Sequence, residues 1–480
     1  MKILNKYILK KTVLLMVPLA MIMGGCSKDF LNLPPELSLP EENSYDTKSR
    51  IEAQVRGLYG SIKDGSFYAG RYQIYNDIRG EDFINRNGNT VTGYSTYQFT
   101  NDASDNYITN FWNQGYLTIN RINKFILDFD NAPSGAVTDA EKSAFIGEAK
   151  FIRGLTYYAL VQLFAKPYAL NSGQSVGIPL RLNAETSTAN SDLAPSPVKD
   201  IYSQILKDLN EAESALPATY SSADVRTTRA HKNTVIALKT RVYLAMRNYQ
   251  QVIVEGNKIV SATAPFKSTT GVAHELQSSI ANVFTTFNTT ESILSWPYAS
   301  TNAPGTQNQL GYYYNVGNIE YYLNPNGIFG NAAWPSSDQR KSALTRLYPG
   351  STWNMLTKWG GTPYLDWVPV IRYAEVLLNL AEAEAEAGSE TRSLALLGAV
   401  RKRSDNTYTF PAFANKQALI DAILLERRIE LLGEGFRAAD AQRRLLPLPA
   451  VGLGTPIAVT DERYTFPIPT NERLTNSEIN

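Results

Sequence analysis

Apolar residues recur at spacings of three and four along several stretches of the chain, and this pattern predicts amphipathic helices. One stripe runs from Phe145 to Leu163. Thr138 and Glu141 precede it with the spacing of a capping box, and Pro167 follows as a helix terminator. Further stripes predict helices over 235–245, from about 249 to 259, and over 371–385, 394–403 and 419–432.

Many inward positions of these helices are Ala or Gly, which let two helices approach closely and favour antiparallel pairs. The run from Arg241 to Tyr249 resembles the inter-helix junction of a tetratricopeptide repeat. The period of such repeats, about 34 residues, is not kept along the chain, so we expect irregular or interrupted repeats. Spacing alone leaves a generic helical bundle as the alternative.

Two long stretches, 66–105 and 261–366, lack this periodicity and are rich in Gly, Asn, Asp and Tyr. The second contains four of the six Trp, with a fifth, Trp367, directly after it, and turn signals such as the one at 302–305. Long irregular segments inside a compact protein are usually functional. We therefore expect a helical scaffold at about 45–65, 108–260 and 370–446, with ligand-loop regions at about 66–107 and 261–369.

The start of the chain has the pattern of a secretory lipoprotein signal. Four lysines precede an apolar stretch at 13–23, which contains Pro18 and is shorter than the roughly 20 residues of a spanning helix. Met23-Gly24-Gly25-Cys26 resembles a bacterial lipoprotein box, in which the cysteine carries the lipid. We expect a removed signal at 1–25, a single body at 26–480 and a membrane anchor on Cys26. An uncleaved anchor or a buried hairpin is the alternative.

Charge and composition exclude several classes of function. The chain has 46 Lys+Arg against 45 Asp+Glu, and loss of the four signal lysines leaves 42 against 45, a net charge of −3. That balance argues against a nucleic-acid partner. One cysteine and two distant histidines, His231 and His274, leave little for a metal site, and we expect no metal and no cofactor.

No phosphate loop, G-x-S-x-G elbow or H-E-x-x-H motif is present, so we expect no catalytic residues. A carboxylate-pair glycosidase stays open, because its two acids can lie far apart in sequence. Glu81 and Asp82 are candidates. Adjacent acids usually point apart, which favours a solvated loop instead.

The irregular stretches combine aromatic rings with Asp, Asn and Arg, the mixture that binds sugars through ring faces and hydroxyls. The alternative is that these aromatics fasten irregular loops to the helices. As ligand-binding candidates we select Tyr75, Asp77, Arg79, Tyr94, Tyr313, Tyr321 and Trp334.

The C-terminal third carries the most specific runs, 370–383, 399–403, 426–437 and 466–469, and their order resembles the SusD/RagB family of nutrient-uptake lipoproteins. The similarity continues upstream in Trp112 to Asn123, in Gly177-Ile178-Pro179-Leu180 and in Asp338-Gln339-Arg340. It covers nearly the whole mature chain.

This resemblance implies a mainly α fold, in which irregular tetratricopeptide-like helix pairs form a scaffold with loop-rich regions and short strands packed on it. It implies that the 426–437 run caps and pairs helices. It also implies a lipoprotein on the outer leaflet of a Gram-negative outer membrane, one that binds and does not catalyse. Such a protein would capture an oligosaccharide and pass it to a SusC-like TonB-dependent transporter. Capture of oligopeptides in the same role is the alternative.

Overall fold

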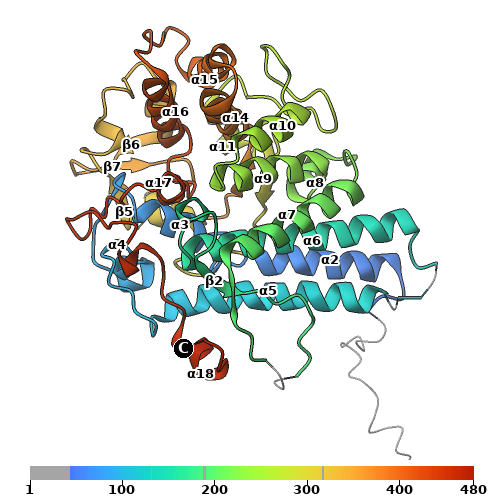
Figure 1. The fold of residues 1–480 in the computed structure, drawn as a ribbon. Coiled ribbons are helices and arrows are strands. Elements are labelled where there is room, and N and C mark those ends of the chain that lie inside the picture. Colours follow the sequence, from blue (N-terminus) through green and yellow to red (C-terminus); the bar gives the residue numbers. More distant parts are fainter. Residues whose placement is uncertain (1–43, 131, 134, 188–190, 316–317, 480) are drawn as a thin grey trace, which may run out of the picture.

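The computed structural model describes residues 44–479 except 131, 134, 188–190 and 316–317 (Figure 1). Its helices are α2 (Lys48–Ile62), α3 (Arg71–Ile78), α4 (Tyr94–Tyr97), α5 (Asn106–Asp130), α6 (Asp139–Phe164), α7 (Val198–Ala215), α8 (Ala223–Thr228), α9 (Lys232–Ala245), α10 (Tyr249–Ile259), α11 (Ile280–Thr285), α12 (Leu310–Tyr314), α13 (Gln339–Leu344), α14 (Tyr373–Ala387), α15 (Glu390–Ser404), α16 (Lys416–Glu430), α17 (Arg437–Arg443) and α18 (Thr470–Thr475). Its strands are β1 (Phe83–Asn85), β2 (Val176–Pro179), β3 (Pro195–Pro197), β4 (Ser292–Trp296), β5 (Tyr321–Leu323), β6 (Thr345–Leu347), β7 (Asn354–Leu356) and β8 (Val368–Arg372). The expected mainly α fold is confirmed.

Helix α6 begins and ends where the local sequence dictates. The Thr138 side chain accepts a hydrogen bond from the backbone of Glu141, and the Glu141 carboxylate accepts one from the backbone of Thr138 at 2.9 Å. This capping box satisfies two backbone donors that the first turn leaves free. At the other end Ala165 takes up extended backbone two residues before Pro167. The predicted capping box and helix end are confirmed.

Helices α9 and α10 form the helix pair that the 241–249 run predicted. Arg247 turns the chain with a φ of 56°, and the Asn248 side chain then caps α10 by accepting from the backbone of Gln251. Further along α10, a Cβ on Gly256 would lie 3.0 Å from Leu380 of α14. The missing side chain therefore allows the two helices to approach closely.

Successive helices stack along the scaffold. Figure 1 shows α5, α2 and α6 side by side at one end, followed by α7, α9, α10 and α14 to α16 at the other. A large core cluster runs through this stack and includes residues from Tyr45 to Phe466. The scaffold and the loop regions therefore share one hydrophobic core.

The helix predicted from Ile371 starts later than expected. Val368–Arg372 forms β8, in which Ile371 pairs with Leu294 of β4, and Arg372 is the extended N-cap of α14. The apolar residues of β8 are buried because the strand packs beside β4. In the sequence their spacing matched that of the following helix, so the prediction placed them in that helix. Gly388 ends α14 as predicted.

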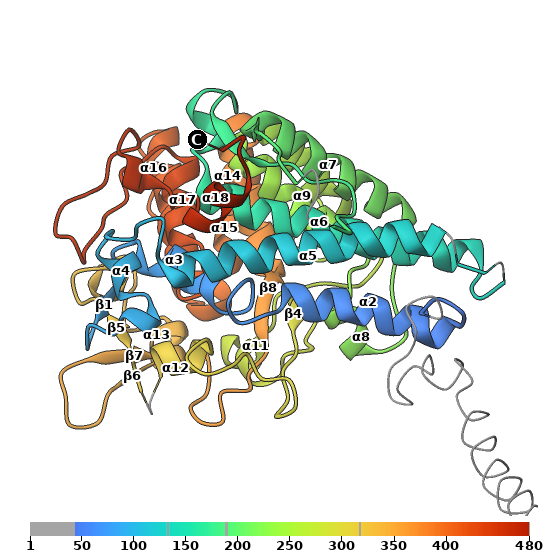
Figure 2. The ribbon, with the colours of Figure 1, turned by 90° about the horizontal axis from the view of Figure 1, so that it is seen from below.

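The loop-rich regions gather on one side of the helical stack (Figure 2). There β1, β5, β7 and β6 form an antiparallel four-stranded sheet that joins the two predicted loop regions, with Phe83 opposite Leu323. The predicted short strands are therefore present.

The first loop region contains a helix that the sequence pattern did not reveal. All eight residues of α3 are buried. A helix enclosed on every side has no polar face and shows no amphipathic period. The interpretation of 66–105 as irregular is therefore wrong over α3.

A buried ion cluster ties the second loop region to the scaffold. Its cations are Arg340, Lys358, Arg372, Arg401 and Arg403, and its acids are Glu291, Asp338, Glu426, Glu430 and Glu434. The five charges of each sign balance. Three of the acids lie in or beside the 426–437 run, so the expectation that this run pairs helices is confirmed.

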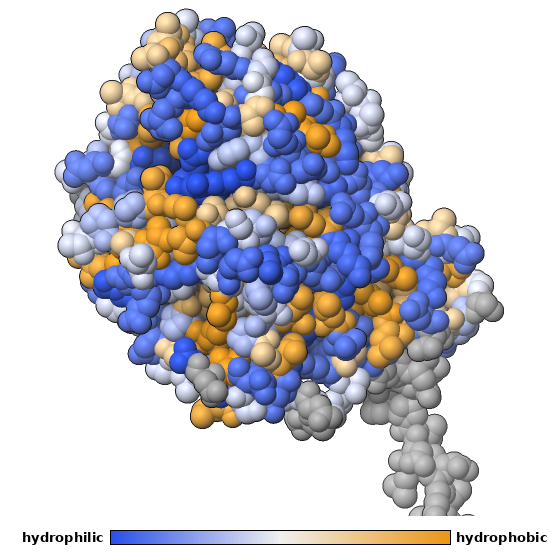
Figure 3. Space-filling view, viewed as in Figure 1, coloured by the Kyte–Doolittle hydropathy of each residue, from blue (hydrophilic) through white to orange (hydrophobic). Residues whose placement is uncertain are grey.

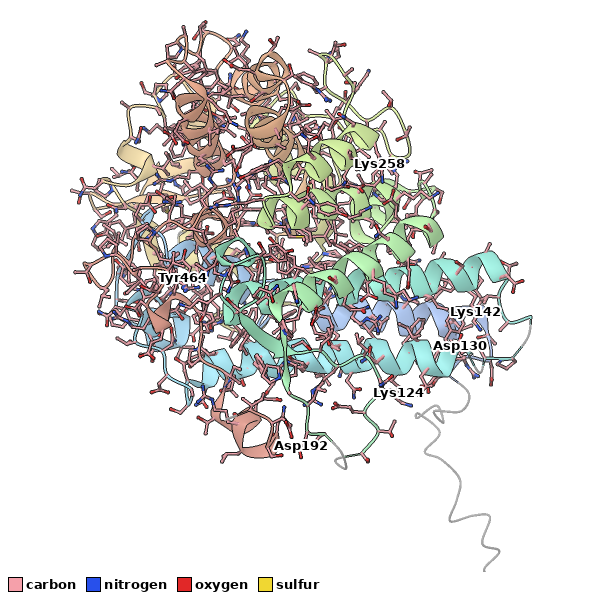
Figure 4. All side chains as sticks on the ribbon, viewed as in Figure 1. Lys124, Asp130, Lys142, Asp192, Lys258 and Tyr464 are labelled. Atoms are coloured by element: carbon pink, nitrogen blue, oxygen red, sulfur yellow. The ribbon has the colours of Figure 1, made fainter. Side chains whose placement is uncertain are left out.

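Hydrophilic residues interrupt the apolar patches on the face in Figure 3. Figure 4 shows one surface contact, in which Lys142 of α6 reaches Asp130 of α5 at 3.4 Å. Among the described residues, no helix is both long and apolar enough to cross a membrane.

Candidate functional site

A cavity of about 760 Å³ lies between the C-terminal half of α2, helix α8 and the segment that follows β4. We call it the α2 cavity. Its lining residues combine aromatic, proline and polar side chains with glycines: Arg56, Tyr59, Gly60, Lys63, Asp64, Gly65, Val225, Thr228, Arg229, Trp296, Pro297, Tyr298, Asn302, Ala303, Pro304 and Gly305.

Three aromatic residues form one wall of the α2 cavity. Trp296 meets Tyr59 edge-to-face, with ring centroids 6.1 Å apart and planes at 65°. The buried Trp296 Nε1 has no hydrogen-bond partner within the described part of the chain. Tyr298 completes this wall two residues further on. Trp296 is fully buried and supports the wall, whereas Tyr59 and Tyr298 each keep 7% of their surface exposed and give the wall an apolar surface that suits the apolar face of a ligand.

Lys63 and Tyr298 hold the segment after β4 against the end of α2. The Lys63 ammonium donates to the Pro297 carbonyl at 2.7 Å, and the Tyr298 hydroxyl donates to the Lys63 carbonyl at 2.6 Å. The ammonium also lies 5.0 Å from the centre of the Tyr298 ring. Burial lowers the pKa of Lys63. The main role of Lys63 is therefore to hold the cavity wall in place, and attraction of a charged ligand is secondary.

Glu148 supports the cavity from behind. It accepts hydrogen bonds from Arg229 Nε at 2.9 Å and from the Tyr59 hydroxyl at 2.7 Å. Burial raises the pKa of Glu148, while Arg229 and Tyr59 oppose that rise. The Tyr59 hydroxyl in turn accepts from the Ala230 backbone at 2.9 Å. Two lining side chains are thus fixed before any ligand arrives.

Gly60 leaves the α2 side of the cavity open. A Cβ built on Gly60 or on Gly57 meets no atom within 4 Å. Glycine inside a helix costs about 1 kcal/mol relative to alanine, yet α2 contains both. Gly60 lines the cavity and Gly57 does not.

Six of the seven predicted ligand residues are buried: Tyr75, Asp77, Arg79, Tyr313, Tyr321 and Trp334. Tyr94 is partly buried, stacks on Tyr97 and accepts a hydrogen bond from Gln98 at 2.7 Å. None of the seven lines the α2 cavity. Their contact with a ligand stays a prediction. Arg79 lines a second, separate cavity.

Three of these residues converge in the interior. Tyr313 stacks on Tyr321 with centroids 6.1 Å apart. The Arg71 guanidinium lies 6.0 Å from the Tyr75 ring and 5.8 Å from the Tyr313 ring. These aromatics pack the loop regions together, which is the alternative that the sequence left open.

Asp77 and Trp334 also have structural contacts. Asp77 accepts from the Gly435 backbone at 2.9 Å, and burial raises its pKa well above the ordinary value. Trp334 meets Phe329 edge-to-face at 6.1 Å and lies beneath the Lys341 ammonium. Both fix loop segments to neighbouring elements.

Glu81 and Asp82 are held by arginines. Glu81 pairs with Arg437 at 2.7 Å, and Asp82 pairs with Arg428 at 2.5 Å. Burial would raise the pKa of Glu81, but Arg437 and Arg428 lower it. Such arginine-bound carboxylates are poorly suited to donate a proton, as the acid of a glycosidase must.

The pattern of residues along the chain did not predict the lining of the α2 cavity. The available signal was the run Trp296-Pro297-Tyr298 just before the turn at 302–305. This run meets the end of α2 only through contacts between residues that lie more than 200 positions apart in the sequence, such as Lys63 and Pro297.

The two histidines are buried and stacked, with ring centroids 5.4 Å apart and planes at 17°. Within the described residues, no group of three His, Cys, Asp or Glu side chains is arranged to hold a metal ion. Cys26 lies outside the described residues.

Stacked helix pairs carrying an aromatic cavity among packed loops define a class of helical-scaffold binding proteins. Two family models match the chain: "Starch-binding associating with outer membrane" over residues 29–244 and "SusD family" over 240–447. A SusD superfamily protein of Bacteroides fragilis is 34% identical, with a TM-score of 0.81, and the match covers 91% of this chain and 100% of that one. The chain therefore belongs to the SusD family.

More distant relatives agree with this assignment. SusD-like protein P2 of Formosa agariphila is 24% identical, and the match covers 98% of this chain and 99% of the relative. A solved structure described as a laminarin binding SusD-like protein has a TM-score of 0.70 at 22% identity, covering 90% of this chain and 98% of that one.

Proposed function

We propose that the protein is a cell-surface lipoprotein that captures an oligosaccharide in the α2 cavity and passes it to a SusC-like TonB-dependent transporter. The observation that carries this proposal is the cavity itself, whose lining sets Tyr59 and Tyr298 beside Asp64 and Asn302. Aromatic faces match the apolar face of a sugar ring, and carboxylate and amide groups match its hydroxyls. The family's description as starch-binding supports the same ligand class.

The composition of the cavity favours binding over hydrolysis. Asp64 is the one carboxylate among its lining residues, whereas a glycosidase needs an acid on each side of the scissile bond. Glu148 lies behind the wall and is bound to Arg229. We therefore propose a binding protein and not an enzyme.

The proposed location is the outer membrane. In this proposal the signal at 1–25 is removed, the lipid on Cys26 anchors a single body at 26–480, and the body faces the exterior. The family model's description as associating with the outer membrane supports it.

Gly60→Leu tests the cavity directly, because the new side chain would fill it from α2. Gly57→Leu is the matched control on the same helix, outside the lining. We expect Gly60→Leu to weaken binding at least about tenfold and Gly57→Leu to leave it unchanged. Isothermal titration calorimetry with starch and laminarin oligosaccharides, chosen after a glycan array, measures both.

Equal affinity in the two variants would place the ligand elsewhere. Peptide binding without glycan binding would replace the oligosaccharide by an oligopeptide. Hydrolysis of any glycan on the array would overturn the assignment as a binding protein.

A further inference from the structure

A second cavity, of about 400 Å³, lies between α4, the segment 99–103 and the segment 462–473. It shares no lining residue with the α2 cavity. We call it the Arg79 cavity, and its lining includes Arg79, Phe99, Asn101, Thr465, Phe466 and Arg473.

Arg79 is a buried cation without a carboxylate partner among the described residues. Its Nη2 donates to the Tyr464 carbonyl at 2.7 Å, and its guanidinium lies 5.4 Å from the Phe99 ring and 5.0 Å from the Phe466 ring. Its Nη1 is buried with no hydrogen-bond partner in the described chain. Figure 4 marks Tyr464 beside this region.

Arg71 is also buried without a carboxylate partner, but it does not line this cavity, and several other buried arginines are neutralised. Arg340 pairs with Asp338 and Glu426, both at 2.6 Å, and Arg372 pairs with Glu434 at 2.7 Å. Burial without such a partner lowers the pKa of Arg79 to about 10. A buried, unpaired charge is costly unless hydrogen bonds and an opposite charge compensate it.

The charged groups at the rim pair with one another or face water, unlike Arg79. Arg463 is paired with Asp461 at 2.7 Å, and Arg473 lines the cavity together with Asp102 and Glu462. The four charged lining residues other than Arg79 are exposed, so water screens them more than it screens Arg79.

We propose that the Arg79 cavity binds the carboxylate group of a small ligand, with Arg79 as its charged partner and Arg473 at the rim. Arginine matches a carboxylate with two parallel hydrogen bonds, and the free Nη1 supplies a donor. Asn101 and Thr465 offer hydrogen bonds to neighbouring hydroxyl or amide groups. The carboxylate belongs to a uronate sugar or to an amino acid. This site is independent of the α2 cavity and of the function proposed for it.

Calorimetry on the wild-type protein at low ionic strength tests the charge requirement. The probes are galacturonate, its uncharged methyl ester and N-acetylglycine. We expect a carboxylate probe to bind at least tenfold more tightly than the ester. Binding of galacturonate alone assigns a sugar, binding of N-acetylglycine alone assigns an amino acid, and binding of both assigns the shared carboxylate. Equal binding of ester and acid, or no binding of either acid, would overturn the proposal.

Two variants locate the site. Arg473→Ala, at an exposed position, should weaken carboxylate binding severalfold, and a folded Arg79→Met should abolish it. Arg346→Ala, at an exposed position of β6 outside both cavities, is the control and should leave it unchanged. Full carboxylate affinity in a folded Arg79→Met protein would also overturn the proposal. If that variant does not fold, the comparison of acid and ester in the wild type still decides.

Discussion

The Nη1 atom of Arg340 lies 2.6 Å from Oε1 of Glu426, although one residue belongs to the second loop region and the other to the scaffold helix α16. Both side chains are fully buried. Their contact is one link of the ion cluster, whose charges balance only when the loop region is docked. Loss of a single acid therefore leaves an uncompensated buried cation.

Glu430→Gln should lower the free energy of unfolding by about 3–5 kcal/mol, because Glu430 contacts Arg340, Arg372 and Arg403. Those arginines hold its pKa well below the ordinary value, against the effect of burial. Urea denaturation at neutral pH measures the loss. Glu390→Gln, at an exposed position in the first turn of α15, should cost less than about 1 kcal/mol. Similar losses in both variants would contradict the role of the cluster.

Acid should destabilise the fold through the stacked histidines. Burial lowers the pKa of His231 to about 3, with a further contribution from His274, and burial lowers that of His274 to about 4. The unfolded state, with a pKa of 6.5, binds more protons below that pH, so stability falls as the pH drops from 6.5 toward 4. At pH 5 each histidine should cost about 2 kcal/mol.

Urea denaturation at pH 7.5 and pH 5.0 measures this loss. A double variant, His231→Phe with His274→Phe, should lose about 4 kcal/mol less between the two pH values than the wild type. An unchanged pH dependence in the double variant would show that the histidines are not responsible.

Tyr313→Ala should act on folding. Its ring is buried against Tyr321 and Tyr314, so its removal should cost about 3–5 kcal/mol. Tyr312→Ala, next to it and only partly buried, should cost less. Thermal and urea unfolding of both variants provide the comparison. A stable Tyr313→Ala protein with weakened glycan binding would instead restore Tyr313 as a ligand residue.

Cys26→Ala should release the protein from the membrane, because the thiol is the proposed attachment point for the lipid. Acyl chains contribute about 0.8 kcal/mol per buried methylene, so their loss removes the anchor. Fractionation of cells followed by immunoblotting measures the distribution. Ser27→Ala is the control and should stay in the membrane fraction. An unchanged fraction for Cys26→Ala would refute the lipid anchor.

Local interactions account for the parts of the fold that the sequence predicted. The capping box at Thr138 and the α9–α10 junction at Arg247 and Asn248 rest on contacts within a few residues. A short window of sequence therefore contains all the residues that determine these two features.

The parts that escaped prediction depend on distant partners. The spacing around Ile371 fits a helix, and only the pairing with Leu294 shows that it lies in a strand. Helix α3 has no polar face because other segments enclose it. The candidate site escaped for the same reason: aromatic residues are numerous, and only the fold decides which of them line a cavity. Tyr298 does, and Tyr313 does not.

The burial of His231 and His274 also has a consequence for the outside of the protein. They are the only histidines of the chain, so its surface carries no imidazole. Imidazole is the one side chain whose ordinary pKa places its charge change between about pH 5 and 8. Between about pH 6 and 8 the exterior should therefore keep a nearly constant charge, so ligand capture should vary little across that range.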